Sequence, residues 1–208
     1  MDIVQAMENR ASVRKFTNDP VPLEHLQEMV RLAGLAPSVN NSQPWKFIVV
    51  TDKERLQCMS GAVREKLGTM LPADASDEQK KAFQKVDWFS TFFVDAPAVI
   101  AVASSPYEAV VDQMLQGTTV GHEDLNDMRG RPDVQSIGAA IQNLLLAAYS
   151  LGYGTCWLSG PVIARESLEK CLEIDQPWRL AAMVAVGKAA VPTKQKEKKS
   201  LDQILEIR

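Results

Sequence analysis

The longest regular pattern in the sequence predicts a helix from Asp133 to Leu151 that is apolar around most of its circumference. Gly152, a residue type that commonly ends helices, follows directly. A helix with so few polar positions needs cover on several sides, so we expect it at the centre of the fold or across a subunit interface. Its apolar side chains recur at intervals of three and four residues, at Ile137, Ala140, Ile141, Leu144, Leu145 and Ala148.

Short apolar runs with several β-branched residues predict strands. They span Phe47 to Thr51, Ala98 to Ala103, Tyr153 to Leu158 and Ala182 to Val186. Shorter helices are expected from Ile3 to Arg10, Pro22 to Gly34, Pro161 to Leu172 and Leu201 to Ile207, with another short one after Asp52. The buried stripe of the second helix is predicted to contain Leu23, Leu26, Val30 and Ala33.

Composition and charge exclude several classes of protein. A net charge of -3 and a pI near 5.5 do not suit a general nucleic-acid binder, which needs a basic face. No window approaches the roughly 18 consecutive apolar residues of a membrane helix, and the first ten residues do not form a signal peptide. The three cysteines, Cys58, Cys156 and Cys171, are an odd number at unrelated spacings, which favours reduced, buried thiols and a cytoplasmic protein.

Several catalytic motifs are absent. Gly152 and Gly154 lead into a predicted strand, and Trp157 stands where a dinucleotide fingerprint needs its third glycine. There is no phosphate-binding loop with its lysine, no nucleophile elbow and no pair of Cys or His residues at zinc spacing. We therefore expect no metal site and no nucleophilic side chain.

Arg10, Ser12 and Arg14 share one side of a segment whose alternating pattern predicts an extended conformation. Guanidinium groups bind phosphate through charge-assisted hydrogen bonds, so the three residues are a candidate anion site. A solvated basic edge explains the same spacing, and both interpretations stay open at this point.

The stretch from Ala36 to Val50 is a polar loop that runs into a predicted strand. The amides of Asn41 and Gln43 both donate and accept hydrogen bonds, which suits the mixed edge of a heteroaromatic ring. With lysines in the tail, these features indicate a ring cofactor that carries a phosphate.

Residues 61–95 and 106–132 are the least regular parts of the single domain predicted for residues 1–208. Each is interpreted as a cover over a pocket, although plain surface insertions look the same. Trp88 and Phe89 are candidates for stacking on a flat ligand, or else they fill the core. A lone His122 in a loop is a weak candidate for a general acid.

Three blocks of sequence resemble the nitroreductase family of FMN flavoproteins. They are RASVRKF at residues 10–16, APSVNNSQPW at residues 36–45, and AAIQNLLLAA followed by LGYGTCW at residues 139–157. The resemblance implies an α+β sandwich with a mixed central sheet flanked by helices. It also implies an intertwined homodimer in which residues 188–208 embrace the partner subunit and two FMN molecules lie at the interface.

The resemblance assigns the residues that contact FMN. Arg10 binds the flavin phosphate with Ser12 beside it, and Arg14 faces the N1 and O2 edge, where negative charge develops on reduction. Lys198 departs from the family pattern because lysine lacks the planar fork of arginine. The full set implied is Arg10, Ala11, Ser12, Arg14, Ser159, Gly160, Lys196 and Lys198 from one subunit, with Pro37, Ser38, Val39 and Asn41 from the other and Gln43 bracing that loop.

The implied reaction is ping-pong hydride transfer through flavin N5, from NADH or NADPH to a nitroaromatic, a quinone or a similar small aromatic acceptor. Flavin carries this chemistry, so no catalytic side chain is expected beyond the electrostatic role of Arg14. The same resemblance leaves two alternatives: a related reaction, such as reductive dehalogenation or the consumption of flavin, and a flavin-binding protein without turnover.

Overall fold

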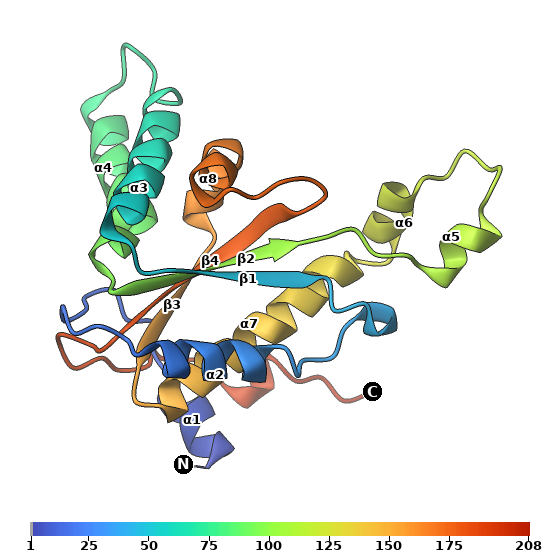
Figure 1. Ribbon diagram of the computed structural model, residues 1–208, viewed down its shortest axis with the longest axis horizontal. Helices are drawn as coiled ribbons and strands as arrows, with labels where there is room; N and C mark the ends of the chain where they lie inside the picture. Colours follow the sequence, from blue (N-terminus) through green and yellow to red (C-terminus); the bar gives the residue numbers. More distant parts are fainter. Residues whose placement is uncertain (1) are drawn as a thin grey trace.

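The computed structural model describes residues 2–208 and is built on a four-stranded antiparallel sheet in the order β1-β2-β4-β3 (Figure 1). Each strand pairs with its neighbour in a continuous register, apart from one bulge between Val102 and Ala103. The strands are β1 (Trp45–Val50), β2 (Ala98–Ser104), β3 (Gly154–Leu158) and β4 (Arg179–Gly187). The α+β sandwich that the sequence predicts is confirmed.

Helices cover both faces of the sheet (Figure 1). One face carries α3 (Lys53–Gly68), α4 (Asp77–Thr91) and α8 (Arg165–Leu172). The other carries α2 (Leu23–Ala33) and α7 (Pro132–Ser150), with α1 (Ile3–Asn9) beside α7. An excursion containing α5 (Val110–Met114) and α6 (His122–Met128) projects beyond the sheet. Short 3-10 turns occupy Val39–Asn41 (η1), Phe92–Asp95 (η2), Gly160–Ala164 (η3) and Leu201–Gln203 (η4).

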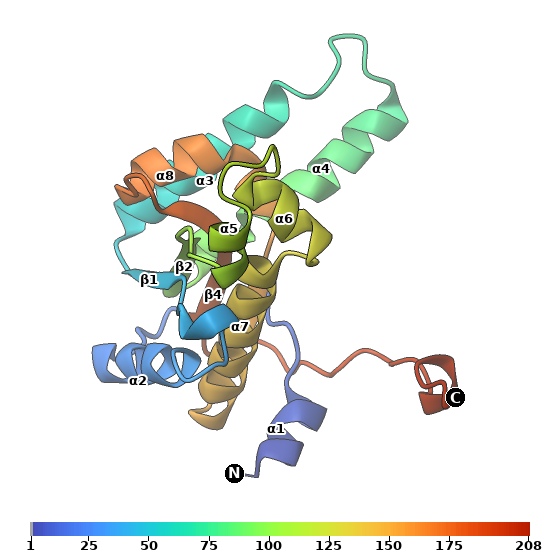
Figure 2. The ribbon, with the colours of Figure 1, turned by 90° about the vertical axis from the view of Figure 1, so that its right-hand side faces the viewer.

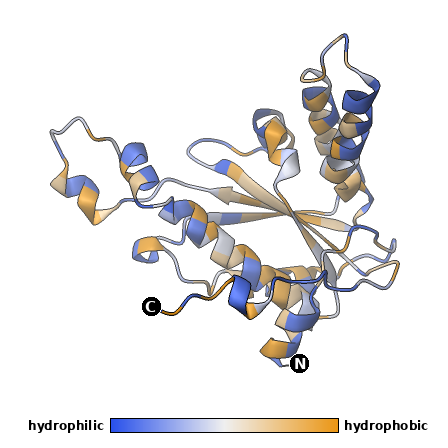
Figure 3. Ribbon diagram, turned by 180° about the vertical axis from the view of Figure 1, so that it is seen from behind, coloured by the Kyte–Doolittle hydropathy of each residue, from blue (hydrophilic) through white to orange (hydrophobic). Residues whose placement is uncertain are grey.

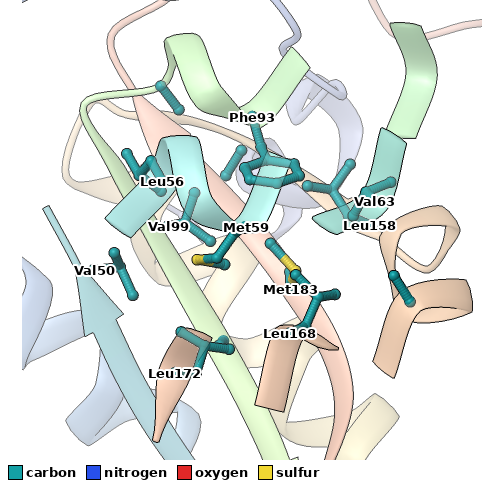
Figure 4. Close-up of a cluster of buried hydrophobic side chains, with 14 of the residues drawn as sticks. Val50, Leu56, Met59, Val63, Phe93, Val99, Leu158, Leu168, Leu172 and Met183 are labelled. Atoms are coloured by element: carbon teal, nitrogen blue, oxygen red, sulfur yellow. The ribbon is translucent and has the colours of Figure 1, made fainter. Parts of the chain in front are cut away.

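Strand β2 explains why the sheet is buried on both sides. Its successive side chains point to opposite faces, so Val99 and Ala101 enter the core under α3 and α8, while Ile100 and Val102 enter the core against α2 and α7. Figure 4 shows the first of these cores, in which Met59, Phe93 and Met183 meet. In Figure 3 the strands are coloured mainly toward the hydrophobic end of the scale.

The segment around residues 10–16 extends the sheet at its β3 edge. Val13 N–H donates to the carbonyl oxygen of Thr155 at 2.9 Å, and Ser12 forms an isolated parallel bridge with Thr155. The four strands themselves are all antiparallel, which corrects the predicted mixed sheet, and within residues 2–208 the parallel pairing is limited to this isolated bridge. A Cβ on Gly154 would overlap the side chain of Val13, so only glycine lets the segment approach this closely.

The C-terminal tail begins alongside the same segment. Thr17 N–H donates to Lys188 O and Ala190 N–H donates to Lys15 O, each at 2.9 Å. Beyond this pairing the tail leaves the body of the fold, and η4 lies far out from the sheet (Figure 2). The expected terminal helix is instead a single 3-10 turn, and its residues are exposed, so tertiary packing gives a longer helix little support.

Several local predictions are confirmed and others need correction. The long helix α7 and the helix caps at Asp2 and Asp52 agree with the sequence analysis. Helix α3 is not short but has 16 residues, so it takes up the first part of the predicted cover. Leu23 is 61% exposed and lies outside the buried stripe of α2, since that helix begins with Leu23 at its free end.

The prediction that all three cysteines are reduced and buried is wrong. Cys58 on α3 and Cys171 on α8 form a disulfide, with their Cα atoms 6.3 Å apart, and Cys58 is exposed. Their 113-residue separation hides this pairing in the sequence, because only the packing of α3 against α8 brings them together. Cys156 is the free cysteine of residues 2–208, and it is buried as expected.

Within residues 2–208, no helix combines the length and apolar character needed to cross a membrane. In the same residues, no three side chains of the His, Cys, Asp or Glu type gather where they would hold a metal ion.

Candidate active site

The predicted anion-binding residues meet at the edge of the sheet beside Cys156. Burial raises the pKa of the Cys156 thiol, and the charges of Arg14 and Arg10 together with the Ser12 hydroxyl oppose that increase. Three side chains that the sequence placed on one side of an extended segment thus influence the same thiol on β3. No ion pair among residues 2–208 involves Arg10 or Arg14.

The aromatic end of α4 lies next to this basic group. The guanidinium carbon of Arg14 is 5.5 Å from the centre of the Phe89 ring, a distance typical of a cation–π contact. Trp88 packs edge-on against Phe89 with ring centres 4.8 Å apart, and the two residues are 45% and 41% exposed. Both rings therefore face outward near Arg14 and do not fill the core.

Ser159 and Gly160 follow β3, and Gly160 contacts the same end of α4. A Cβ on Gly160 would come within 2.8 Å of Ser90 Oγ, so the missing side chain allows the turn to pack against α4. The end of β3, the end of α4 and the segment carrying Arg14 thus converge.

The polar loop lies elsewhere in the chain, at the N-terminal end of α7. Val39 N–H donates to Ser136 Oγ at 3.0 Å, and Gln43 N–H donates to Ser38 Oγ at the same distance. Gln43 also donates from Nε2 to Asn41 Oδ1 at 3.5 Å, so its side chain braces the loop. This loop leads into β1, whereas the basic segment borders β3, and these two strands are the opposite edges of the sheet.

The tail approaches Arg10 through one side chain. Gln195 Nε2 donates to Met7 O at 3.1 Å and to Arg10 O at 3.4 Å. Lys196 is the next residue, and Lys198 follows two positions later, both exposed. The tail charges thus enter the neighbourhood of Arg10 by a contact that the sequence pattern did not indicate.

A cavity of about 950 Å³ opens at the end of the sheet where β2 and β3 finish and β4 begins. Ser159 lines it, whereas Arg10, Ser12 and Arg14 do not. Tyr107, His122 and Asn126, which belong to the excursion with α5 and α6, line one side of the cavity. Its charged and aromatic lining includes Arg131, Arg165, Arg179, Asp133, Tyr107 and Trp157.

A connected network of polar contacts joins residues of this excursion. His122 Nδ1 lies 2.8 Å from Asp112 Oδ2, and Asn126 Nδ2 lies 3.3 Å from His122 Nε2. A neutral His122 satisfies both contacts when it donates to Asp112 and accepts from Asn126. Tyr107 donates to Asn126 Oδ1 at 2.6 Å, and burial raises the pKa of its hydroxyl. The hydrogen bond from the Ala109 backbone N–H lowers the pKa of the Asp112 carboxyl, and the smaller effect of His122 acts in the same direction.

Sequence reasoning missed Arg165 and Arg179. Each is a single cation next to an apolar run. Arg165 follows the turn of residues 160–164, and Arg179 is the first residue of β4. Nothing in that spacing relates the two, because only the fold brings the start of α8 and the start of β4 to one cavity.

Comparison with known proteins places this arrangement in a family. A model of the nitroreductase family matches residues 7–188. The chain belongs to the nitroreductase family. This assignment confirms the predicted resemblance and the prediction that the chain is an oxidoreductase of the nitroreductase type.

Three similar proteins show the range of functions among the relatives of this chain. A protein of Archaeoglobus fulgidus, named as a candidate NADH dehydrogenase/NAD(P)H nitroreductase, is 31% identical over 78% of this chain and 69% of its own length. A 5,6-dimethylbenzimidazole synthase of Rhodospirillum rubrum is 28% identical over 86% of this chain and 77% of its own. The crystal structure of a BluB-like flavoprotein from Clostridium difficile 630 superposes with a TM-score of 0.90 at 29% identity, covering 100% of this chain and 99% of that one.

Proposed function

We propose that this nitroreductase is an FMN-dependent NAD(P)H oxidoreductase that reduces a nitroaromatic, a quinone or a similar small aromatic acceptor. The observation that carries the proposal is the family match over residues 7–188, which includes the segment where Arg10, Ser12 and Arg14 meet at Cys156. Support for the cofactor comes from the Clostridium difficile neighbour, which is a flavoprotein, and support for the donor comes from the name of the Archaeoglobus relative.

The basic group fits a phosphorylated flavin. Within residues 2–208 its two guanidinium groups lack a carboxylate partner, so an anion that binds there displaces no internal ion pair. Arg10 and Ser12 would hold the phosphate together with Lys196 and Lys198 of the tail. Arg14 would lie beside the ring, with Ser159 and Gly160 at the end of β3.

When bound, FMN supplies the exchange of a hydride between donor and acceptor. The chain contributes position and charge. Arg14 would place a positive charge beside the ring, and its packing on Phe89 would limit how far that charge can move.

A homodimer is part of the proposal, because the loop of Pro37, Ser38, Val39 and Asn41 would reach the flavin from the partner subunit. The large exposed apolar residues of α1 and of the tail give such a dimer a surface to bury. They are Ile3, Val4, Met7, Leu201, Ile204, Leu205 and Ile207. A cytoplasmic location also belongs to the proposal, although the disulfide between Cys58 and Cys171 weighs against a reducing compartment.

Anaerobic titration with NADH and NADPH tests the proposal. The purified protein is expected to be yellow, to lose its visible absorbance with at least one donor, and to regain it when menadione or a nitroaromatic is added. Flavin that stays oxidised with both donors would contradict the proposal. Turnover no faster than that of free FMN would instead leave a flavin-binding protein without catalysis.

A second function is favoured by two of the similar proteins, the 5,6-dimethylbenzimidazole synthase and the BluB-like flavoprotein. In that case the chain would consume FMN and not recycle it. Exposure of the reduced protein to oxygen, followed by chromatography of the small molecules, separates the two functions. Quantitative recovery of FMN supports the oxidoreductase, and loss of FMN with formation of dimethylbenzimidazole supports the synthase.

A further inference from the structure

The cavity at the end of the sheet has a basic wall made by two arginines that lie outside the residue set proposed to hold FMN. Arg165 begins α8 and Arg179 begins β4, and both line the cavity together with Ser159. Its volume of about 950 Å³ is near the upper end for small-molecule sites, which span roughly 300–1,000 Å³.

Both arginines lack internal partners. Among residues 2–208, neither guanidinium takes part in a side-chain hydrogen bond or an ion pair, and Arg165 Nε is buried without any acceptor. A buried donor left unsatisfied destabilises the fold unless a ligand completes it. Two free guanidinium groups at one cavity are suited to a carboxylate, which accepts hydrogen bonds from both.

The carboxylates of the cavity are already paired. Arg131 donates to Glu123 at 2.7 Å and to Asp133 at 2.8 Å, and it also holds Asp127 at 3.2 Å. Three carboxylates surround Arg131, and Asp133 Oδ1 has no partner among residues 2–208, so this corner of the cavity is acidic while the corner with Arg165 and Arg179 is basic. The cavity is therefore polarised.

Apolar and aromatic groups lie between the two corners. Trp157 is 43% exposed at the cavity, and Ile137 and Tyr107 line it as well. The aromatic ring of a ligand packs well on such a surface, and a charged group at one end of that ligand fixes its orientation.

We propose that the acceptor of this enzyme is an aromatic carboxylic acid, whose carboxylate binds Arg165 and Arg179 while its ring packs on the wall with Trp157. The inference rests on the proposed oxidoreductase function for the reaction, but the carboxylate site is a property of the cavity itself. Arg165 and Arg179 are then specificity-determining residues.

Three matched acceptors test the proposal with the flavin-loaded protein: 4-nitrobenzoate, nitrobenzene and 4-nitrobenzylamine. The wild type is expected to prefer the anion, and the ratio of kcat/KM for 4-nitrobenzoate to that for nitrobenzene should fall about tenfold or more in Arg165→Gln and in Arg179→Gln. Arg165→Lys keeps the charge and should recover part of the ratio. Arg31→Gln, on α2 and paired with Glu28, is the control and should leave the ratio unchanged.

Calorimetric titration with benzoate provides a readout without turnover. Benzoate should bind to the wild type, and its affinity should fall about tenfold in Arg179→Gln. This result would support the proposal even if no acceptor were reduced, because a lack of reduction would refute only the oxidoreductase function. Equal kcat/KM for the anion and the neutral acceptor, a preference for the amine, or loss of bound FMN in Arg165→Gln would each overturn the proposal. The last result would assign that arginine to the cofactor.

Discussion

Gln195 donates a hydrogen bond from its side-chain amide to the carbonyl oxygen of Arg10 across a separation of 185 residues. The same amide reaches Met7 O at 3.1 Å, so one side chain fastens the tail to the end of α1. The contact determines where the tail lysines start, and it joins the two basic segments that we propose to hold the flavin phosphate.

Replacement of Gln195 by Ala is expected to weaken FMN retention several-fold with little effect on folding. A net hydrogen bond contributes about 0.5–1.5 kcal/mol, and the exposed tail supports no core. Fluorescence of released FMN during dialysis measures the effect. Gln57→Ala on the exposed side of α3 is the matched control. Unchanged retention would show that the tail is positioned by other contacts.

Gly154→Ala is expected to destabilise the protein by about 1–3 kcal/mol, because the new methyl group overlaps Val13 and pushes the edge segment away from β3. The variant should also lose FMN, since that segment carries Arg10, Ser12 and Arg14. Urea denaturation and visible absorbance measure the two effects.

Gly61→Ala is the control for this substitution. Gly61 lies within α3, where an added Cβ meets no atom within 4 Å, so alanine should stabilise the helix by up to about 1 kcal/mol. If the two alanine variants behaved alike, the close approach of Val13 to Gly154 would not be a constraint.

Reduction of the disulfide between Cys58 and Cys171 is expected to lower stability by about 2–4 kcal/mol, because the bond closes a long loop of 113 residues in the unfolded chain. The Cys58→Ser variant should be destabilised by the same amount as the wild type is by dithiothreitol, and dithiothreitol should not lower the stability of this variant further. Titration of the unfolded, unreduced protein should find one thiol, that of Cys156. Three thiols would show that the bond does not form in the purified protein.

The stability of the fold should decrease at alkaline pH through Cys156. Burial raises its pKa, so the folded protein keeps the thiol proton at pH values where the unfolded chain, with a pKa of about 8.5, has lost it. The contribution is complete below that value and is lost as the pH rises toward the raised pKa. Cys156→Ala should show a flatter decrease between about pH 8 and pH 10 in urea denaturation. Identical slopes would contradict the shift.

Much of the local structure follows from sequence. Helix α7 is evident from its periodicity, the caps at Asp2 and Asp52 from residue type, and β2 from an uninterrupted apolar run, because each depends on side chains close together in the chain. The basic group at Arg10, Ser12 and Arg14 is visible for the same reason, since alternation in an extended segment is a local property.

Contacts between distant residues required the tertiary structure. The disulfide of Cys58 and Cys171 depends on the packing of α3 against α8, and the contact of Gln195 with Arg10 depends on the return of the tail to the N-terminal segment. Arg165 and Arg179 line the same cavity because the first residues of α8 and β4 lie at that cavity in the folded chain. The sequence by itself determined the helices, the strands and the family of this protein. The tertiary structure decided which charged groups and which thiols lie close together, because interactions between such groups depend on distances in space that spacing along the chain does not specify.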